Sequence, residues 1–219
     1  MKLTKYAQSC FLIETKNKRI LIDPSYFKYD EFLLEHDWKN IDILLITHKH
    51  KDHFHKDAIR TILDNENTQL FTSKEVSKEY SEFKANIVEE DDVINCELFK
   101  IKVVKAIHGF IPTMKGKQVK EGLGFIIFDG QKKIYHTGDT ICFENDYKAD
   151  VVLAPVSGRG LVMGPYEAAL FTKECGAELL IPCHMDNPKY VVHPDFLKKV
   201  FEEENVNYKL LKNGESLKI

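Results

Sequence analysis

The sequence predicts an α/β fold, in which strands and helices alternate along the chain. Apolar or alternating runs of strand length, bounded by turn residues, recur in both halves of the 219 residues. Helical patterns lie between these runs, and two of them begin at a proline. The composition, 43% apolar and 30% charged, is that of a folded globular protein. Alternation of this kind is typical of helices packed on sheets.

The first half of the chain contains five predicted strands and two predicted helices. The strands cover residues 2–6, 9–15, 19–22, 41–46 and 67–72, and the helices cover residues 57–63 and 74–83. Asp23-Pro24 ends the third strand, because proline cannot donate to the hydrogen-bond ladder of a sheet. The fourth strand ends directly before a group of histidines.

The second half contains five more predicted strands and two more helices. The strands cover residues 98–106, 122–128, 132–137, 151–154 and 179–182. Asp129-Gly130 predicts a hairpin between the second and third of these. One helix begins at Pro165 and ends near Gly176, and the last helix begins at Pro194.

The length suits one compact domain, or two fused half-domains with a shared core. We expect a single domain over residues 1–219. The five cysteines are odd in number and have no framework spacing, which predicts free thiols and a cytoplasmic location. The N-terminus lacks a signal-peptide pattern, and no apolar run has the length of a membrane span.

The charge of the chain bears on its partners. A formal net charge of −3 argues against a strongly basic surface, so no stable nucleic-acid partner is expected. A local basic patch is still allowed, because lysines cluster around Lys115, Lys117 and Lys120. The surrounding residues 110–121 fit either a mobile lid or an ordinary polar loop. The acidic run at residues 89–92 predicts a solvated turn. The oligomeric state cannot be read from the sequence.

The histidine group, residues 48–53, has the composition and spacing of a metal-binding loop. His48 and His50 are two residues apart, so they point the same way at the end of an extended strand. Asp52 and His53 follow as the chain turns toward a helix, where they can face a second point. One loop can therefore supply two ligands to each of two neighbouring metal ions. Imidazole and carboxylate suit zinc, which we expect first, and also manganese or iron.

Three further candidate ligands follow predicted strands elsewhere in the chain. They are His108, Asp139 and His184. Gly138 lets the backbone turn sharply before Asp139, whose two carboxylate oxygens can bridge two ions. The predicted assignment puts His48, His50 and His108 on one ion. Asp52, His53 and His184 then bind the other ion, and Asp139 lies between the two.

Four other histidines have a structural as well as a functional interpretation. His55 is expected to be an exposed residue of the first helical turn, and His36 a surface residue. His136 fits either a core histidine or a support for the ligands. His193 is expected to cap a helix or lie at the surface, with proton donation at the mouth of the site as the alternative.

Two more features lie next to candidate ligands. Cys183 is expected to be a buried thiol, because neighbours on a strand face opposite ways. Arg159, in the sequence Ser157-Gly-Arg-Gly160, fits either a surface loop or a binding group for phosphate or carboxylate.

The order of the candidate ligands resembles that of the metallo-β-lactamase superfamily of metal-dependent hydrolases. This order is His-x-His-x-Asp-His, then His108, then Gly138-Asp139, then His184. Residues 9–14 and 20–24 resemble the opening strands of that superfamily. Residues 134–140 and 163–169 resemble the branch that contains ascorbate-phosphate lactonase and many uncharacterised metal-dependent hydrolases. The likeness runs over nearly the whole chain.

The resemblance implies a fold and a reaction. The fold is a four-layer αβ/βα sandwich with the metal site between two sheets. The reaction is hydrolysis, in which two divalent ions activate a bridging water that attacks an ester-like bond. Asp52 is the candidate for proton handling in addition to its role as a ligand.

The expected substrate is a lactone or ester of a small metabolite, which can carry a phosphate group. One alternative is a phosphodiesterase acting on a nucleotide or a phospholipid headgroup. The alternative from another class is a non-catalytic metal-binding sensor on the same scaffold, for which a missing ligand would be the sign. None of the ligand positions is missing here.

Overall fold

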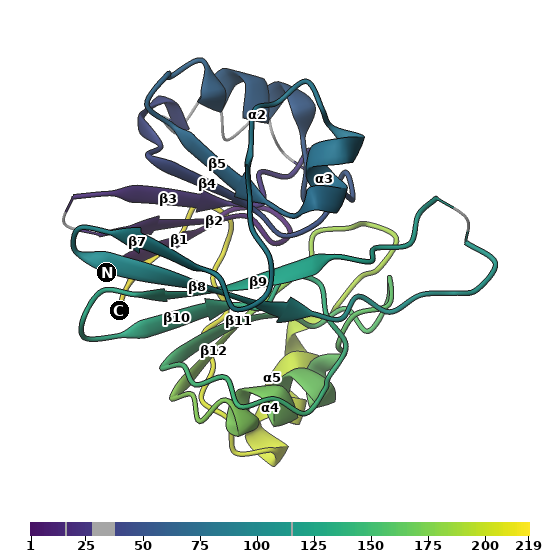
Figure 1. Ribbon diagram of the computed structural model, residues 1–219. Coiled ribbons are helices and arrows are strands. Elements are labelled where there is room, and N and C mark those ends of the chain that lie inside the picture. Colours follow the sequence, from purple (N-terminus) through teal and green to yellow (C-terminus); the bar gives the residue numbers. More distant parts are fainter. Residues whose placement is uncertain (16, 28–37, 115) are drawn as a thin grey trace. The chain divides into compact units, whose positions relative to one another are not determined.

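The computed structural model describes residues 1–15, 17–27, 38–114 and 116–219 (Figure 1). The chain divides into two compact units. Unit 1 comprises residues 1–89 and 211–219, and unit 2 comprises residues 90–210. Each unit contains one mixed β-sheet with helices packed on it. The α/β class is therefore confirmed within each unit, whereas the single domain over residues 1–219 stays a prediction.

The sheet of unit 1 has the strand order β13-β1-β2-β3-β4-β5-β6. Its strands are β1 (Lys2–Lys5), β2 (Phe11–Glu14), β3 (Arg19–Ile22), β4 (Ile43–Ile46), β5 (Gln69–Thr72), β6 (Asn86–Ile87) and β13 (Ser216–Lys218). The pairs from β13 to β3 are antiparallel, and those from β3 to β6 are parallel. Because β3 and β4 run in parallel, the residues that follow them emerge at the same edge of the sheet.

The helices of unit 1 bury apolar faces in one core. They are the 3-10 helix η1 (Trp38–Asn40), α2 (Lys56–Leu63) and α3 (Lys74–Glu79). Ala58, Ile59 and Ile62 of α2 share a buried cluster with Leu21 and Leu44 of the sheet. The Ser73 hydroxyl accepts a hydrogen bond from the Val76 N–H and caps α3.

The sheet of unit 2 has the strand order β12-β11-β10-β9-β8-β7. Its strands are β7 (Val93–Cys96), β8 (Phe99–Ala106), β9 (Gly122–Phe128), β10 (Lys133–His136), β11 (Val151–Pro155) and β12 (Leu179–Cys183). Pairs from β7 to β10 are antiparallel, and those from β10 to β12 are parallel. Strands β8, β10, β11 and β12 therefore point the same way, and the segments that follow them leave one edge of the sheet.

Helices α4 (Pro165–Glu174) and α5 (Pro194–Glu203) cover part of one face of this sheet. Phe171 of α4 and Phe201 of α5 share a buried cluster with Tyr135, Val152 and other residues of this face. The Phe171 ring lies 6.0 Å from that of Tyr135, centroid to centroid. The same cluster contains Val104 of β8 and Ile126 of β9.

Each strand and helix predicted above has a counterpart in the structure, with ends that differ by a few residues. The Asp129-Gly130 hairpin is confirmed: Gly130 has φ +90°, and the Asp129 side chain accepts the Gln131 and Lys132 N–H groups. The predicted end of the helix at residue 83 is wrong, because α3 ends at Glu79. There the chain leaves the helix so that Tyr80 and Phe83 enter the core.

The structure also contains elements that were not predicted, namely η1, β6, β7 and β13. All of them are short, so they carry little periodic signal. β6 and β7 also bear mainly exposed residues, and β13 is defined by pairing with a strand more than two hundred positions earlier. Among the described residues, no helix combines the length and apolar character needed to cross a membrane.

Truncation of the Phe171 side chain should show what the packing of α4 contributes. Phe171 is fully buried, so Phe171→Ala removes an aromatic ring and leaves a cavity. We expect a loss of about 3–5 kcal/mol in the free energy of unfolding, measured by urea denaturation followed by circular dichroism. Leu170→Ala is the matched control, because Leu170 is adjacent and 37% exposed; it should cost less than about 1 kcal/mol. Equal losses in the two variants would contradict the assigned packing.

Thiol reactivity should separate buried from accessible cysteines. None of the five cysteines, all of which are described, forms a disulfide, and burial raises the pKa of Cys175 to about 12. Only the thiolate is nucleophilic, so roughly one Cys175 in 10⁴ is reactive at pH 8, and labelling should accelerate about tenfold per pH unit below that pKa. Mass spectrometry after alkylation should therefore find Cys96 on edge strand β7 modified before Cys175. The difference should vanish in urea; Cys175 labelled first in the folded protein would be the contrary result.

Candidate metal centre

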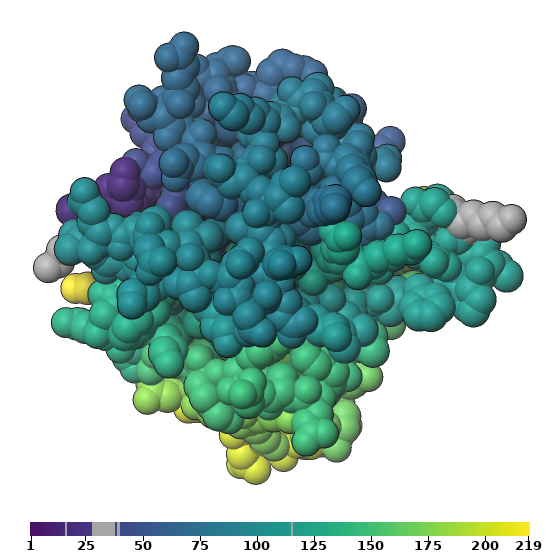
Figure 2. Space-filling view, in the orientation of Figure 1, coloured from purple at the N-terminus to yellow at the C-terminus, as the bar shows by residue number. Residues whose placement is uncertain are grey.

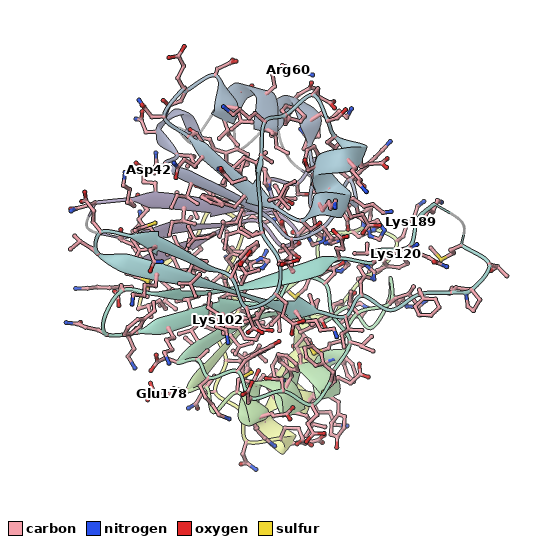
Figure 3. All side chains as sticks on the ribbon, in the orientation of Figure 1. Asp42, Arg60, Lys102, Lys120, Glu178 and Lys189 are labelled. Atoms are coloured by element: carbon pink, nitrogen blue, oxygen red, sulfur yellow. The ribbon has the colours of Figure 1, made fainter. Side chains whose placement is uncertain are left out.

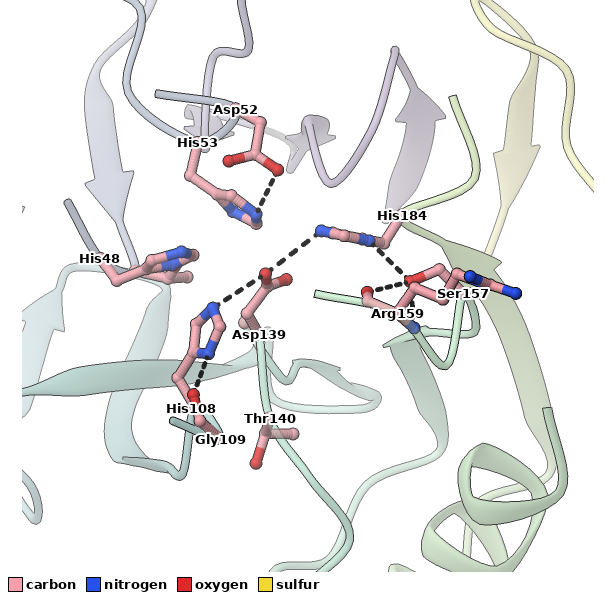
Figure 4. Close-up of polar contacts among 12 residues, drawn as sticks. His48, Asp52, His53, His108, Gly109, Asp139, Thr140, Ser157, Arg159 and His184 are labelled. Atoms are coloured by element: carbon pink, nitrogen blue, oxygen red, sulfur yellow. Dashed lines mark hydrogen bonds and ion pairs between the residues drawn. The ribbon is translucent and has the colours of Figure 1, made fainter. Parts of the chain in front are cut away.

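The predicted metal-binding loop of unit 1 gathers its imidazoles directly after β4. The ring of His48 lies 4.8 Å from that of His50 and 4.1 Å from that of His53, centroid to centroid. The His50 carbonyl accepts the His53 and Phe54 N–H groups at 2.9 Å, which folds the loop into a tight turn before α2. Nε2 of His53 lies 3.9 Å from Oδ2 of Asp52 (Figure 4). The four residues form what we call the unit 1 cluster.

Asp23 supports this cluster through both carboxylate oxygens. Oδ1 accepts the Thr47 N–H at 2.8 Å, and Oδ2 accepts the Thr47 hydroxyl at 2.6 Å. Nδ1 of His53 lies 2.7 Å from the same Oδ2. Because a carboxylate accepts hydrogen bonds, the proton of neutral His53 is on Nδ1, and Nε2 carries a lone pair suited to a metal ion.

The Thr47 hydroxyl sets the orientation of His48 in the same way. Its hydrogen is donated to Asp23, so its oxygen accepts a hydrogen bond from Nδ1 of His48 at 3.0 Å. Nε2 of His48 is then also the unprotonated nitrogen. Asp52 is held from another side, because Nε2 of the fully buried Gln8 donates to its Oδ2 at 3.0 Å. Both Gln8 and Asp23 have positive φ, +61° and +49°.

In unit 2, the residues after three strands of one direction form a second group, the unit 2 cluster: His108, Asp139 and His184. Nε2 of His108 lies 3.5 Å from Oδ2 of Asp139, and Nε2 of His184 lies 3.2 Å from the same oxygen (Figure 4). All three side chains are buried. One carboxylate oxygen is thus close to the Nε2 nitrogens of two imidazoles.

The Nδ1 atoms of unit 2 also act as donors. Nδ1 of His108 lies 3.1 Å from the Gly109 carbonyl, which can only accept. The Ser157 hydroxyl donates to the Arg159 carbonyl at 2.8 Å, so its oxygen accepts from Nδ1 of His184 at 3.1 Å. Four imidazoles, two in each unit, therefore have an acceptor at Nδ1, which leaves Nε2 as the nitrogen that a metal ion would take. This donor set, with carboxylates and without thiolates, fits zinc, manganese or iron.

Backbone conformation keeps the unit 2 cluster in place. Gly138 has φ +63° in the turn before Asp139, as predicted, and its N–H donates to Nδ1 of His136. A Cβ atom on Gly109 would lie 2.9 Å from the Leu161 Cβ, so only glycine fits beside that residue. The Gly109 N–H donates to the Leu161 carbonyl at 3.0 Å. His184 itself has φ +61°. This conformation costs conformational energy for any residue other than glycine.

The structure decides several of the open interpretations. His136 is buried and supports the turn before Asp139. His55 does not lie exposed on the first helical turn; it is half-buried and caps α2, accepting the Ala58 N–H at 3.3 Å. His193 occupies the N-cap position of α5 and is exposed. Cys183 is buried, as predicted. His36 lies outside the described residues.

Two surface segments, residues 110–121 and 89–92, had predictions of their own. Residues 110–114 and 116–121 project from the rest of unit 2 (Figure 2). Phe110 in this segment is 64% exposed. A lid role for this segment stays a prediction, and Lys115 lies outside the described residues. The acidic run at residues 89–92 is exposed, as expected of a solvated turn.

Sequence reasoning missed the two residues that hold the unit 1 cluster. Asp23 was interpreted only as the end of a strand, although an aspartate directly after a buried strand is a signal for a supporting carboxylate. Gln8 gave no such signal, because a single glutamine in a short loop is ordinary. Its contact with Asp52 depends on the pairing of β1 with β2 and on its left-handed backbone.

Known proteins provide an independent comparison. Residues 2–184 match the family model described as the beta-lactamase superfamily domain. A UPF0173 metal-dependent hydrolase of Korarchaeum cryptofilum is 30% identical, with 100% of both chains covered.

Two solved structures share the fold. Igni18, a metallo hydrolase from Ignicoccus hospitalis, has a TM-score of 0.78 and 24% identity, covering 99% of this chain and 97% of its own. The metallo-β-lactamase fold protein YhfI from Bacillus subtilis has a TM-score of 0.78 and 17% identity, covering 99% and 98%.

The family match covers most of the chain, and the relative and both structures extend over nearly all of it. The folds of the two units and the His/Asp donor sets agree with this match. The chain belongs to the beta-lactamase superfamily and is a metal-dependent hydrolase with the metallo-β-lactamase fold.

Proposed function

We propose that the unit 1 and unit 2 clusters together hold two divalent metal ions. His48, His50 and His108 would bind one ion, and Asp52, His53 and His184 the other, with Asp139 between them. Zinc is the first candidate, and manganese and iron are the alternatives. The observation that carries this proposal is common to four imidazoles: Nδ1 of His48, His53, His108 and His184 each lies at an acceptor, which leaves Nε2 for a metal.

The proposed reaction is hydrolysis of an ester-like bond. When bound, two such ions lower the pKa of a water molecule and polarise the oxygen of the substrate. Asp52 is the proposed proton carrier among the residues of the chain. The hydrogen bond from Gln8 to Oδ2 fixes the orientation of this carboxylate, so that the proton is held at a defined position.

The proposed substrate is a lactone or ester of a small metabolite that can carry a phosphate group. Arg159 supports an anionic substrate, because it is exposed on the loop whose Ser157 hydroxyl holds His184. A guanidinium in such a place can bind phosphate or carboxylate through two parallel hydrogen bonds. A cytoplasmic location is also proposed, and the five free cysteines support it.

Removal of one loop histidine should test the metal assignment. His50→Ala should lower the metal content of the purified protein, measured by plasma mass spectrometry, and should abolish turnover. Lys51→Ala is the matched control, because Lys51 is the exposed neighbour in the same loop; its metal content should equal that of the wild type. Full occupancy and full activity of His50→Ala would overturn the assignment.

A substrate panel tests the reaction class on the metal-loaded protein. It comprises lactones, acyl esters, thioesters and bis(p-nitrophenyl) phosphate, and one lactone is supplied with and without a phosphate group. We expect turnover of lactones or esters, with a lower KM for the phosphorylated member of the pair. Arg159→Ala should remove that KM difference. Turnover of the phosphodiester alone would instead indicate a phosphodiesterase.

The bridging role of Asp139 has its own test. Asp139→Asn replaces one of the two carboxylate oxygens by an amide nitrogen, which donates and does not bind metal. We expect the stoichiometry to fall from about two ions per chain toward one, because the bridge is lost. Asp195→Asn on the exposed first turn of α5 serves as the control. Two ions per chain in Asp139→Asn would show that Asp139 does not bridge.

A further inference from the structure

The sheet of unit 2 carries two rows of facing side chains on the same face as α4 and α5. Neighbours in one row are Val93, Lys102, Ile126 and Tyr135, which are paired across β7, β8, β9 and β10. Neighbours in the next row are Asn95, Lys100, Phe128 and Lys133. Strand register thus places Lys100 and Lys102 beside apolar side chains of β9.

Only part of this face is covered by helices. Tyr135 is buried against Phe171 of α4, whereas Lys100 and Lys102 on β8 are exposed, and Val93 on β7 is 48% exposed. Lys102 is labelled in Figure 3. On this uncovered part, the lysines of β8 therefore lie next to the exposed Val93 and the half-buried Phe128.

The uncovered part of the face is hollowed. A cavity of about 370 Å³ is lined by four lysines, and its apolar side chains include Ile126 and Phe128. The lysines are Lys100, Lys102, Lys133 and Lys148. Two ammonium groups are held over aromatic rings: Nζ of Lys133 lies 5.7 Å from the Phe128 centroid, and Nζ of Lys102 lies 5.9 Å from that of Tyr147. Cation–π contacts of this kind position the ammonium groups without neutralising them.

The charges in the cavity do not cancel. Asp146 is the one acidic residue that lines it. Lys102 also lies 3.3 Å from Asp91, but both side chains are largely exposed, so this pair is weak. Nζ of Lys148 donates to the Glu174 carbonyl, a neutral group. The cavity therefore keeps a positive potential over an apolar floor.

We propose that this cavity binds a small organic phosphate. Its phosphate groups would contact the four lysines, and its apolar or planar part would lie on Ile126 and Phe128. The volume is within the range of ligand pockets. A long nucleic acid is disfavoured, because the chain has a net charge of −3 and would repel a polyanion beyond the patch. None of the lining residues is a proposed metal ligand, so the inference does not depend on the proposed hydrolysis.

Calorimetry with three probes should test this assignment. Adenosine triphosphate, adenosine and inorganic triphosphate would each be titrated into metal-free protein, so that binding to catalytic metal does not contribute. We expect adenosine triphosphate to bind at least about tenfold more tightly than either fragment, because it uses both the lysines and the floor. Failure of adenosine triphosphate to bind, or equal affinity for either fragment, would overturn the proposal.

Charge-reversal variants should locate the site. Lys100→Glu combined with Lys133→Glu should weaken binding of adenosine triphosphate about tenfold or more. Lys198→Glu combined with Lys199→Glu makes the same charge change on exposed positions of α5 and is the control. Equal losses in the two double variants would show general electrostatics and overturn the site. Melting curves verify folding, and Lys100→Ala with Lys133→Ala replaces the reversal if it destabilises the sheet.

Two more observations keep the test decisive. Amide shifts on adding adenosine triphosphate should centre on residues 93–102, 126–133 and 146–148; shifts confined to the unit 2 cluster would contradict the assignment. A mixed-sequence single-stranded oligonucleotide should bind no more tightly than adenosine triphosphate. Affinity that rises steadily with oligonucleotide length would identify a nucleic-acid surface instead and overturn the small-ligand proposal.

Discussion

The carboxylate of Asp23 is the interaction on which the unit 1 cluster depends. It is fully buried, and a buried charge is tolerated only when hydrogen bonds replace its hydration. Two of these bonds come from Thr47 and a third from His53, so one side chain joins the end of β3 to the loop that follows β4. Because β3 and β4 are paired in parallel, Asp23 and the loop after β4 lie close together at the same edge of the sheet. The hydrogen bonds that the buried carboxylate requires and the pairing of the strands therefore favour the same orientation of the His53 ring.

Unit 2 reaches the same chemical state by other means. The Nδ1 atoms of His108 and His184 lie at a backbone carbonyl and a serine hydroxyl, respectively. Neutral acceptors donate less electron density through an imidazole than a carboxylate does, so the four rings are not electronically equivalent. A metal centre built from these ligands would therefore contain imidazoles of unequal donor strength.

The elements that position the site were predictable where periodicity and turn chemistry agreed. Ile43–Ile46 is apolar and ends directly before the histidine loop. Gly138 in the sequence indicates the turn before Asp139. The supports were not predictable, because Gln8 and Ser157 act through contacts made only after the chain has folded. His55 was misjudged for a related reason: an imidazole can cap a helix, although serine or aspartate is usual there. The role of a single polar residue in a loop depends on its tertiary contacts, which the local sequence does not specify.

The close approach of Gly109 to Leu161 has a consequence for any attempt to change substrate preference. The loop that carries Arg159 and the loop that follows His108 are joined by the hydrogen bond from the Gly109 N–H to the Leu161 carbonyl, and the contact leaves no room for a side chain on Gly109. Grafting a longer segment at residues 157–163 would therefore move His108 as well as the grafted residues. New specificity would be reached more readily through side-chain replacement on the existing loop than through changes in its length.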